Sequence, residues 1–396
     1  MTASRDFIFG RWRAVLVLGV TQILQWGAIF YTPVLVVPLI AADRGWSISF
    51  AMGGFSFGLL AGGLSAPIVG RSIDRFGGHV VMGIGSLVGA AGLALITMAA
   101  HPAAYYGVWI VLGVGMAAGL YDPAFATLGR IFGTGARRAI TLLTLAGGFA
   151  STVSWPVTHH LLVNVGWQRT YLIYAAVLAV ICAPLHAFLL PRERFDHAAA
   201  PLPEGVKPHR IYPPHGLIFL LVAAAFTTYA FVPSGMSAHL LAIFKRAGID
   251  AATVVWIGAL FGPAQVGARI LELTFGGNMH PVWIGRIALT LLLCAFAMLA
   301  LLGFSVPVAA AFALMFGAAN GLITIARGAV PLALFGAAGY GRLMGRLAMP
   351  FLLMQAAAPL VMAFVVERFS DPAALSLTAA FAAVALACFV LIRRPA

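Results

Sequence analysis

Long apolar segments recur from one end of the chain to the other, and this pattern constrains the fold more than any other feature. Hydrophobic residues make up 62% of the 396 residues, whereas charged residues make up only 9%. A soluble domain is about 45–50% apolar and about 25% charged, because its surface needs polar side chains. The sequence therefore predicts an integral membrane protein and argues against a soluble enzyme.

Twelve segments are long enough to cross the hydrocarbon core as helices, which requires about 20 apolar residues. We expect spans near residues 14–40, 48–70, 79–99, 104–129, 139–163, 169–190, 215–243, 252–275, 282–303, 306–327, 342–365 and 372–392. One long hydrophilic stretch separates the first six spans from the last six. The predicted fold is all-α, with a six-helix bundle over residues 1–190, a cytoplasmic linker over 191–214 and a second six-helix bundle over 215–396.

Basic residues flank the apolar segments singly or in pairs and account for the net charge of +13. A nucleic-acid-binding protein would instead gather them on one face or in one tract, so we expect no nucleic-acid partner. With the N-terminus inside, 18 of the 24 Lys and Arg residues fall on the inner side and five on the outer side, while Arg269 lies within a span. This asymmetry predicts a multi-pass membrane protein with both termini in the cytoplasm.

Motifs of several enzyme classes are missing from the sequence. The chain contains no G-x-x-x-x-G-K-[ST], no H-E-x-x-H and no G-x-S-x-G. Its three cysteines, Cys182, Cys294 and Cys388, lie far apart inside apolar segments and have no metal-ligand spacing. We therefore expect neither enzymatic activity nor a cofactor nor a bound metal.

A charged motif, Gly70-Arg71-Ser72-Ile73-Asp74-Arg75-Phe76-Gly77-Gly78-His79, stands between the second and third spans. We expect a loop here, in which the paired glycines form a tight reversal. Two interpretations of Asp74 stay open: its carboxylate caps the N-terminus of a neighbouring helix, or it belongs to a plain charged loop of no special role. The motif resembles the signature G-x-x-x-D-R-x-G-x-[RK] of the major facilitator superfamily, with His79 at the last position. The resemblance implies two pseudo-symmetric six-helix bundles and makes Asp74 and Arg75 gating candidates.

Other segments resemble the bacterial relatives of the monocarboxylate and oxalate–formate transporters within that superfamily. Tryptophan follows glycine before the second and sixth spans, in Gly45-Trp46-Ser47 and Gly166-Trp167-Gln168-Arg169, and the eighth span reads Gly262-Pro263-Ala264-Gln265-Val266-Gly267-Ala268-Arg269. The arginine of the monocarboxylate carriers matches Arg269, but the aspartate expected four residues earlier is Gln265. The resemblance implies transport across a bacterial inner membrane, with a carboxylate as the expected substrate class.

Arg269 is the most informative residue for function. A guanidinium at membrane depth costs about 2.5–3.5 kcal/mol on insertion scales, so it is expected to face a wet cavity or a partner. One interpretation is a bidentate site for a substrate carboxylate. The other is an ion pair with Glu272, three residues later on the same helix face, or with Asp122.

Further polar and aromatic residues within the spans are candidates for a cavity or for helix–helix contacts. The substrate-binding candidates besides Arg269 are Gln25, Tyr31, Tyr121, Trp155, Tyr229, Gln265, Asn320 and Gln355. The gating or coupling candidates besides Asp74 and Arg75 are Asp122, Glu272 and His239. Pro123 is expected to interrupt the fourth span beside Asp122, whose other interpretation is a structural pair with an arginine such as Arg130. His239 is either a proton site that titrates near neutral pH or a hydrogen-bonded residue between helices.

These observations predict a secondary active transporter, a symporter or antiporter that moves a small organic solute by alternating access. A carboxylate is the leading substrate class. The alternative is a neutral or amphipathic aromatic compound, either a vitamin such as riboflavin taken up or a drug-like compound exported. The expected partners are the small-molecule substrate, the lipid bilayer and a coupling proton or counter-anion, and the protein is expected to be a monomer.

Overall fold

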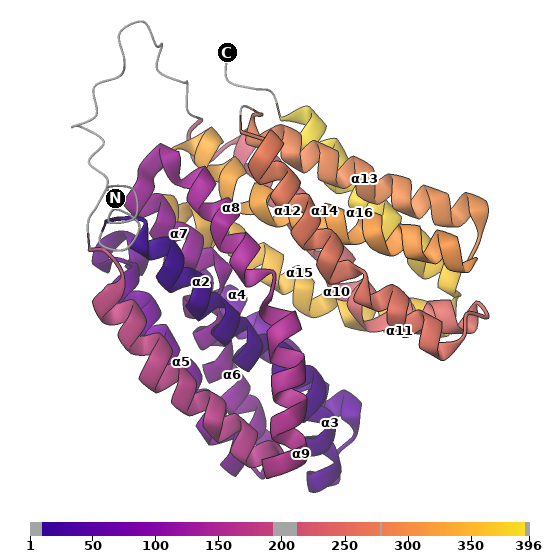
Figure 1. Cartoon of the computed structure of the whole chain (residues 1–396), viewed down its shortest axis with the longest axis horizontal. Coiled ribbons are helices and arrows are strands. Elements are labelled where there is room, and N and C mark those ends of the chain that lie inside the picture. The colour runs from indigo at the N-terminus through magenta and orange to yellow at the C-terminus, as the bar shows by residue number, and fades with distance from the viewer. Residues whose placement is uncertain (1–9, 193–211, 278, 393–396) are drawn as a thin grey trace, which may run out of the picture. The chain divides into compact units, whose positions relative to one another are not determined.

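The computed structural model describes residues 10–192, 212–277 and 279–392, and within these ranges the chain forms helices and no strand (Figure 1). Most of the predicted linker lies outside the described residues, as do residues 1–9 and 393–396 at the two ends. The cytoplasmic position of the linker and the termini therefore remains a prediction.

The chain divides into two compact units. The first comprises Met1–Arg210 together with Phe335–Met349, and the second comprises Ile211–Leu334 together with Pro350–Ala396. Helix α15 (Tyr340–Arg368) contributes to both, because its first turns pack in the first unit and the remainder packs in the second.

The first unit is drawn in indigo to magenta in Figure 1. Its α-helices are α2 (Arg13–Gln25), α3 (Thr32–Arg44), α4 (Ile48–Phe76), α5 (Gly78–Met98), α6 (Pro102–Gly119), α7 (Tyr121–Phe132), α8 (Ala136–Gly147) and α9 (Ala150–Val177). Three π-helical turns interrupt the spans: η1 (Trp26–Tyr31), η3 (Leu178–Cys182) and η4 (Leu185–Leu189). Such turns are rare and occur often at functional sites.

The second unit is drawn mainly in orange to yellow in Figure 1. Its helices are α10 (Leu217–Arg246), α11 (Ala251–Ala259), α12 (Phe261–Phe275), α13 (Pro281–Leu302), α14 (Val306–Phe335), the greater part of α15, and α16 (Asp371–Leu391). Helix α16 packs against both α10 and α13.

The helices have the length and the surface of membrane spans. Ten continuous helical stretches among the described residues are long and apolar enough to cross a membrane, and one of them, Pro102–Leu189, runs for 88 residues. That stretch covers three predicted spans, and each of the other nine stretches covers one. The ten stretches therefore fit the predicted number of twelve spans. The last two spans of Pro102–Leu189 are separated at Gly166, whose φ of 77° belongs to the left-handed region that glycine adopts readily. Large apolar side chains such as Phe275 and Leu301 are more than 80% exposed, as expected of a surface that faces lipid.

Two predicted helix ends are wrong. Helix α4 continues through the charged motif to Phe76 and stops only at Gly77, which has a φ of 86°, so Asp74 lies in the last turns of a helix rather than in a loop. Helix α14 continues to Phe335, eight residues past the predicted end at residue 327, so Arg327 lies inside the helix. In both places a charged residue suggested the end of a span, although arginine is a good helix former and does not stop a helix.

Glycines bring helix backbones into contact in the first unit. A Cβ on Gly113 of α6 would overlap the carbonyl of Gly58 and approach the backbone nitrogen of Gly62, both on α4. Small residues at such positions let helices pack closely in lipid, where apolar burial between helices contributes little.

One arginine joins several helix ends of the first unit. Arg44, the last residue of α3, donates hydrogen bonds to the carbonyls of Ile96 and Ala99 at the end of α5. Its guanidinium carbon lies 5.3 Å from the ring centroids of both Trp46 and Trp167. The two tryptophans that follow glycine in the sequence thus hold one cation between them.

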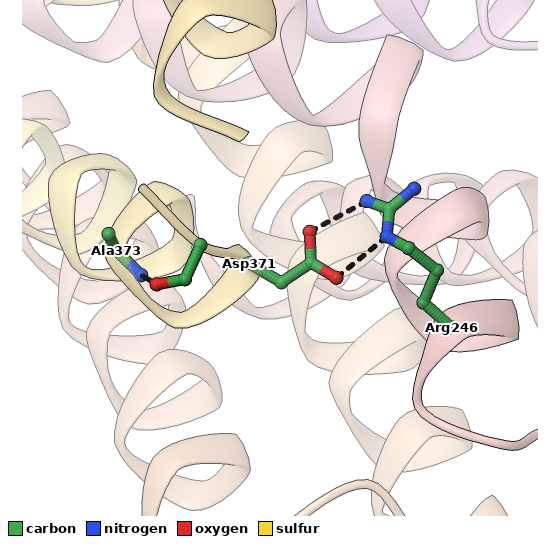
Figure 2. Close-up of polar contacts among 4 residues, drawn as sticks. Arg246, Asp371 and Ala373 are labelled. Carbon is green, nitrogen blue, oxygen red and sulfur yellow. Dashed lines mark hydrogen bonds and ion pairs between the residues drawn. The ribbon is translucent and has the colours of Figure 1, made fainter. Parts of the chain in front are cut away.

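An ion pair joins two helices of the second unit at one end (Figure 2). Arg246, the last residue of α10, donates from Nε to Asp371 Oδ2 at 2.8 Å and from a terminal nitrogen to Oδ1 at 2.6 Å. The hydrogen bond to Asp371 raises the pKa of Arg246. Asp371 lies in the first turn of α16, where a negative charge is favoured, and Ser370 caps the same turn through the backbone N–H of Ala373.

Candidate functional site

Aromatic side chains of the first unit form a connected network of ring contacts, and we call six of them the aromatic cluster. It consists of Trp26, Phe30, Tyr31, Phe55, Tyr121 and Trp155, and these residues come from η1, α4, α7 and α9. The rings of Trp26 and Tyr121 have centroids 5.0 Å apart, and those of Tyr31 and Trp155 are 6.4 Å apart. Trp155 is 49% exposed, so the cluster remains accessible on one side.

The cluster unites three candidates that the sequence analysis named from different spans: Tyr31, Tyr121 and Trp155. It also contains Trp26, Phe30 and Phe55, which the prediction did not include. Of these three, Trp26 could have been predicted as a site residue from the sequence, because it directly follows the candidate Gln25. The π-helical turn that begins at Trp26 offsets the helix register there, and sequence periodicity does not reveal that shift.

Two glutamines of α2 meet the fourth span where it breaks. Helix α6 ends at Gly119 and α7 begins at Tyr121, with the extended residue Leu120 between them. Gln22 donates from Nε2 to the carbonyl of Gly119 at 2.7 Å, and its Oε1 accepts from Trp26 Nε1 at 3.0 Å. Gln25 lies against Gly119, where any Cβ would overlap its Oε1 atom.

Asp122 lies at this break, in the first turn of α7. The break falls at Leu120 and not at Pro123, contrary to the sequence prediction, because proline is well tolerated in the first turn of a helix. A carboxylate in that turn is favoured by the helix dipole. Asp122 also lines a small pocket formed with α4, α6 and the first turns of α15, which includes Gly70 and Gly341.

Asp74 caps a helix, as one of its two interpretations predicted. Its carboxylate accepts hydrogen bonds from the backbone N–H groups of Gly341 at 2.8 Å and Arg342 at 2.7 Å, in the first turn of α15. A Cβ on Gly341 would overlap the carbonyl of Gly70 and approach the Asp74 carboxylate, so glycine is needed for this close approach. The carboxylate thus satisfies two amides that the start of a helix leaves without partners.

Arg130 of α7 contacts the C-terminal end of α4, the helix that carries Asp74. Its guanidinium donates to the carbonyls of Ile73 and Asp74, which are among the last of α4. Cations are favoured at helix C-termini for the same reason that anions are favoured at N-termini. Arg75, the second gating candidate of the motif, is exposed and lies over the ring of Phe76 at 4.9 Å.

In the second unit, Arg269 is buried inside the span formed by α11 and α12. Its side chain is 2% exposed, and its guanidinium donates to the carbonyl of Gly321 on α14 at 3.4 Å and to Gln265 Oε1 at 3.5 Å. A Cβ on Gly321 would overlap the backbone of Gln265, and one on Gly317 would overlap that of Phe261, so α12 and α14 are in close backbone contact beside this arginine. Glu272 follows on the same helix and is 8% exposed.

A second arginine belongs to this region and is not among the candidates predicted from the sequence. Arg327 is half-buried in α14, and its guanidinium carbon lies 3.4 Å from the ring centroid of Phe351. The charges of Arg269 and Arg327 both act on Tyr229 of α10, whose hydroxyl donates to Asn320 Oδ1. The structure therefore brings the candidates Tyr229, Asn320 and Arg269 together and adds Arg327.

Two other candidates of the second unit have different surroundings. Gln355 of α15 accepts a hydrogen bond from Ser234 through its backbone carbonyl at 2.7 Å, so this contact does not involve its carboxamide. His239 lies ten residues beyond Tyr229 on α10, about 15 Å along the helix axis. It is half-buried at that position.

Comparison with known proteins identifies the family. The model of the Major Facilitator Superfamily matches residues 16–323. The crystal structure of the human organic anion transporter MFSD10 (TETRAN) is similar, with a TM-score of 0.74 and 18% sequence identity over 97% of this chain and 99% of that chain. The proton:xylose symporter XylE, bound to 6-bromo-6-deoxy-D-glucose, has a TM-score of 0.71 and 13% identity over 97% of this chain and 96% of that chain.

At these levels of identity the two structures show a shared fold and no more. Among curated proteins, none matches the sequence significantly. The family model covers most of the chain, and the helices have the length and composition of membrane spans. The chain belongs to the Major Facilitator Superfamily and is a multi-pass membrane transporter of that type.

Proposed function

We propose that this transporter is a secondary carrier of a small organic anion with a carboxylate group, which it moves across a bacterial inner membrane by alternating access. The observation that carries the proposal is the burial of Arg269 inside a membrane span. Arginine keeps its charge in proteins, and its planar fork matches a carboxylate with two parallel hydrogen bonds. The resemblance of the Arg269 segment to the monocarboxylate and oxalate–formate transporters supports the same substrate class.

Several polar groups lie around Arg269. Its guanidinium donates to the carbonyl of Gly321 at 3.4 Å and to Gln265 Oε1 at 3.5 Å, so polar groups of two helices surround the charge. Tyr229 and Asn320 add a hydroxyl and an amide nearby, and Arg327 adds a second positive charge. A few polar groups within apolar walls are typical of small-molecule sites.

A second candidate function follows from the aromatic cluster of the first unit. Its rings offer stacking surfaces, and the partly exposed Trp155 makes them accessible. If Glu272 neutralises Arg269, the aromatic residues determine selection, and the substrate is a neutral or amphipathic aromatic compound. Both proposals keep the orientation with cytoplasmic termini that the positive-inside rule favours, a coupling proton or counter-anion, and a monomeric carrier.

Substitutions of Arg269 separate the two functions. A carboxylate clamp predicts that Arg269→Lys loses most of the affinity, because an ammonium lacks the planar pair of donors, and that Arg269→Ala binds too weakly to detect. A structural pair with Glu272 predicts instead that single variants lose stability and expression, and that Arg269→Gln with Glu272→Gln restores both. Ligand affinity in this double variant, measured at matched expression, decides between them, and near-normal affinity would refute the anion clamp.

Arg286 provides a matched control for Arg269→Lys. Its guanidinium donates three hydrogen bonds of 3.1 Å to the carbonyls of Phe389, Val390 and Ile392, where α16 ends. Arg286→Lys is therefore expected to lower the melting temperature while ligand affinity stays unchanged. Equal losses of affinity in Arg269→Lys and Arg286→Lys would contradict a specific clamp at Arg269.

A further inference from the structure

Helix α15 is held by different parts of the molecule along its length. It runs as one helix from Tyr340 to Arg368, yet its residues up to Met349 pack in the first unit and those from Pro350 onward pack in the second. The change from one unit to the other therefore falls inside a continuous helix, directly before a proline.

Close contacts hold the first turns of α15 in the first unit. A Cβ on Gly345 would overlap the carbonyl of Ala66 on α4, so the two backbones touch there. A Cβ on Gly129 of α7 would overlap the ring of Tyr340, which is 1% exposed. Together with the Asp74 cap, these contacts fix the first turns of α15 on α4 and α7.

The contacts of the second unit begin one residue after the proline. The ring of Phe351 lies against Arg327 of α14, whose guanidinium carbon is 3.4 Å from the ring centroid. Further along, the carbonyl of Gln355 accepts a hydrogen bond from Ser234 of α10 at 2.7 Å. Met362 of the same segment is fully buried. The part of α15 after Pro350 is thus anchored on α10 and α14.

Pro350 is the weakest point between these two anchored segments. A proline has no backbone N–H, so residue 350 cannot donate the α-helical hydrogen bond to residue 346, and its ring crowds the preceding turn. A bend elsewhere in the helix breaks a helical hydrogen bond, whereas at Pro350 that bond is already missing. Pro359 is a second proline inside α15, but the segments on both sides of it belong to the second unit.

We propose that α15 bends at Pro350 when its first turns leave α4 and α7, while the segment from Phe351 onward stays packed in the second unit. Pro350 is then the hinge of the contact that Asp74 closes. The alternative is a rigid helix, all of which moves together with the second unit. The inference goes beyond the proposed function, because a hinge in α15 does not depend on which substrate the carrier moves.

The rate of thiol labelling measures how often the first turns leave α4. Met344 lies in these turns and is 1% exposed, so a cysteine there is expected to react only when they are released. The parent is the full chain with Met344→Cys and with its three natural cysteines replaced by alanine. Pro350→Ala supplies the missing N–H and stiffens the helix, so it is expected to slow labelling by about fivefold or more. Pro359→Ala is the matched control and is expected to label within about twofold of the parent rate.

A second measurement keeps Pro350 and displaces the first turns instead. Gly345→Leu cannot keep the backbone contact with Ala66, so it moves these turns away from α4. Spin labels on Arg342→Cys and Leu360→Cys, two exposed positions of α15, stand about 27 Å apart along the axis of a straight helix. The hinge predicts that Gly345→Leu shifts and widens the distribution of distances between the labels. Adding Pro350→Ala is expected to restore the narrow distribution, because the displaced helix then stays straight.

Each outcome supports or overturns the proposal. If Pro350→Ala labels at the parent rate, or if Pro359→Ala slows labelling as much, the hinge at Pro350 is refuted. If Gly345→Leu leaves the distance distribution unchanged, α15 moves as a rigid helix and the inference is wrong. Should one of the variants fail to fold, the other measurement decides by itself. The carboxylate clamp is tested separately at Arg269, so it stands or fails independently of the hinge.

Discussion

Replacing Asp74 by Asn tests the contact between α4 and the start of α15. The Asp74 carboxylate accepts two backbone hydrogen bonds, from Gly341 and Arg342, and its negative charge lies at a helix N-terminus. An asparagine side chain of the same shape keeps one acceptor oxygen, but it loses the charge and the second acceptor. We therefore expect Asp74→Asn to impair transport while ligand binding by the variant remains measurable.

The size of the effect follows from these contacts. A hydrogen bond to a charged group contributes roughly 1.5–3 kcal/mol when it is buried, and a charge at a helix end contributes about 0.3–1 kcal/mol. Because Asp74 is half-buried and Asn retains one bond, the expected loss is about 1–2 kcal/mol. A change of this size shifts the population in which α15 is released from α4 by roughly 5–30-fold.

Cysteine labelling measures that population directly. Met344 of α15 belongs to the first unit and is 1% exposed, so a cysteine at this position is expected to react slowly with a soluble thiol reagent. In a background with the three natural cysteines replaced by alanine, Asp74→Asn is expected to raise the labelling rate of Met344→Cys by roughly 5–30-fold. Asp43→Asn, at an exposed position, is the control. An unchanged labelling rate together with normal transport in Asp74→Asn would refute the capping role.

Three further predictions concern packing, pH and orientation. Gly113→Ala is expected to lower the free energy of unfolding by about 1–3 kcal/mol, because the added Cβ overlaps the backbone of α4. Gly107 lies on the same helix with open space around it, so Gly107→Ala is the control and should not destabilise the protein in thermal unfolding. The hydrogen bonds from Thr253 lower the pKa of Asp250 below its ordinary value of 3.8. The contribution of Asp250 to stability is therefore present above pH 3.8 and is lost as the pH falls below it. Asp250→Asn should reduce the change in melting temperature measured between pH 5 and 3. Cysteines at Asp43 and Lys207 should label from opposite sides of intact cells, and labelling of both from outside would contradict the proposed orientation.

The candidate sites show which residues could be identified without a structure. Arg269 was identifiable because a lone cation within a long apolar segment stands out whatever its neighbours are. Arg327 was not, because it lies near the end of the predicted span, and a charge at that place is ordinary.

The membrane-spanning helices and the family could be predicted from the sequence alone, whereas the ends of α4 and α14 could not. The physical reason is that a bilayer requires each spanning segment to be long, apolar and helical, and this requirement acts on consecutive residues. The tertiary structure decided which polar groups meet. Asp74 reaches α15 through the close contact of Gly70 with Gly341, and the π-helical turn after Gln25 brings Trp26 and Tyr31 into one aromatic cluster with Tyr121 and Trp155. These contacts depend on the rotation and close approach of helices that are distant in sequence, and local hydropathy does not encode either of them.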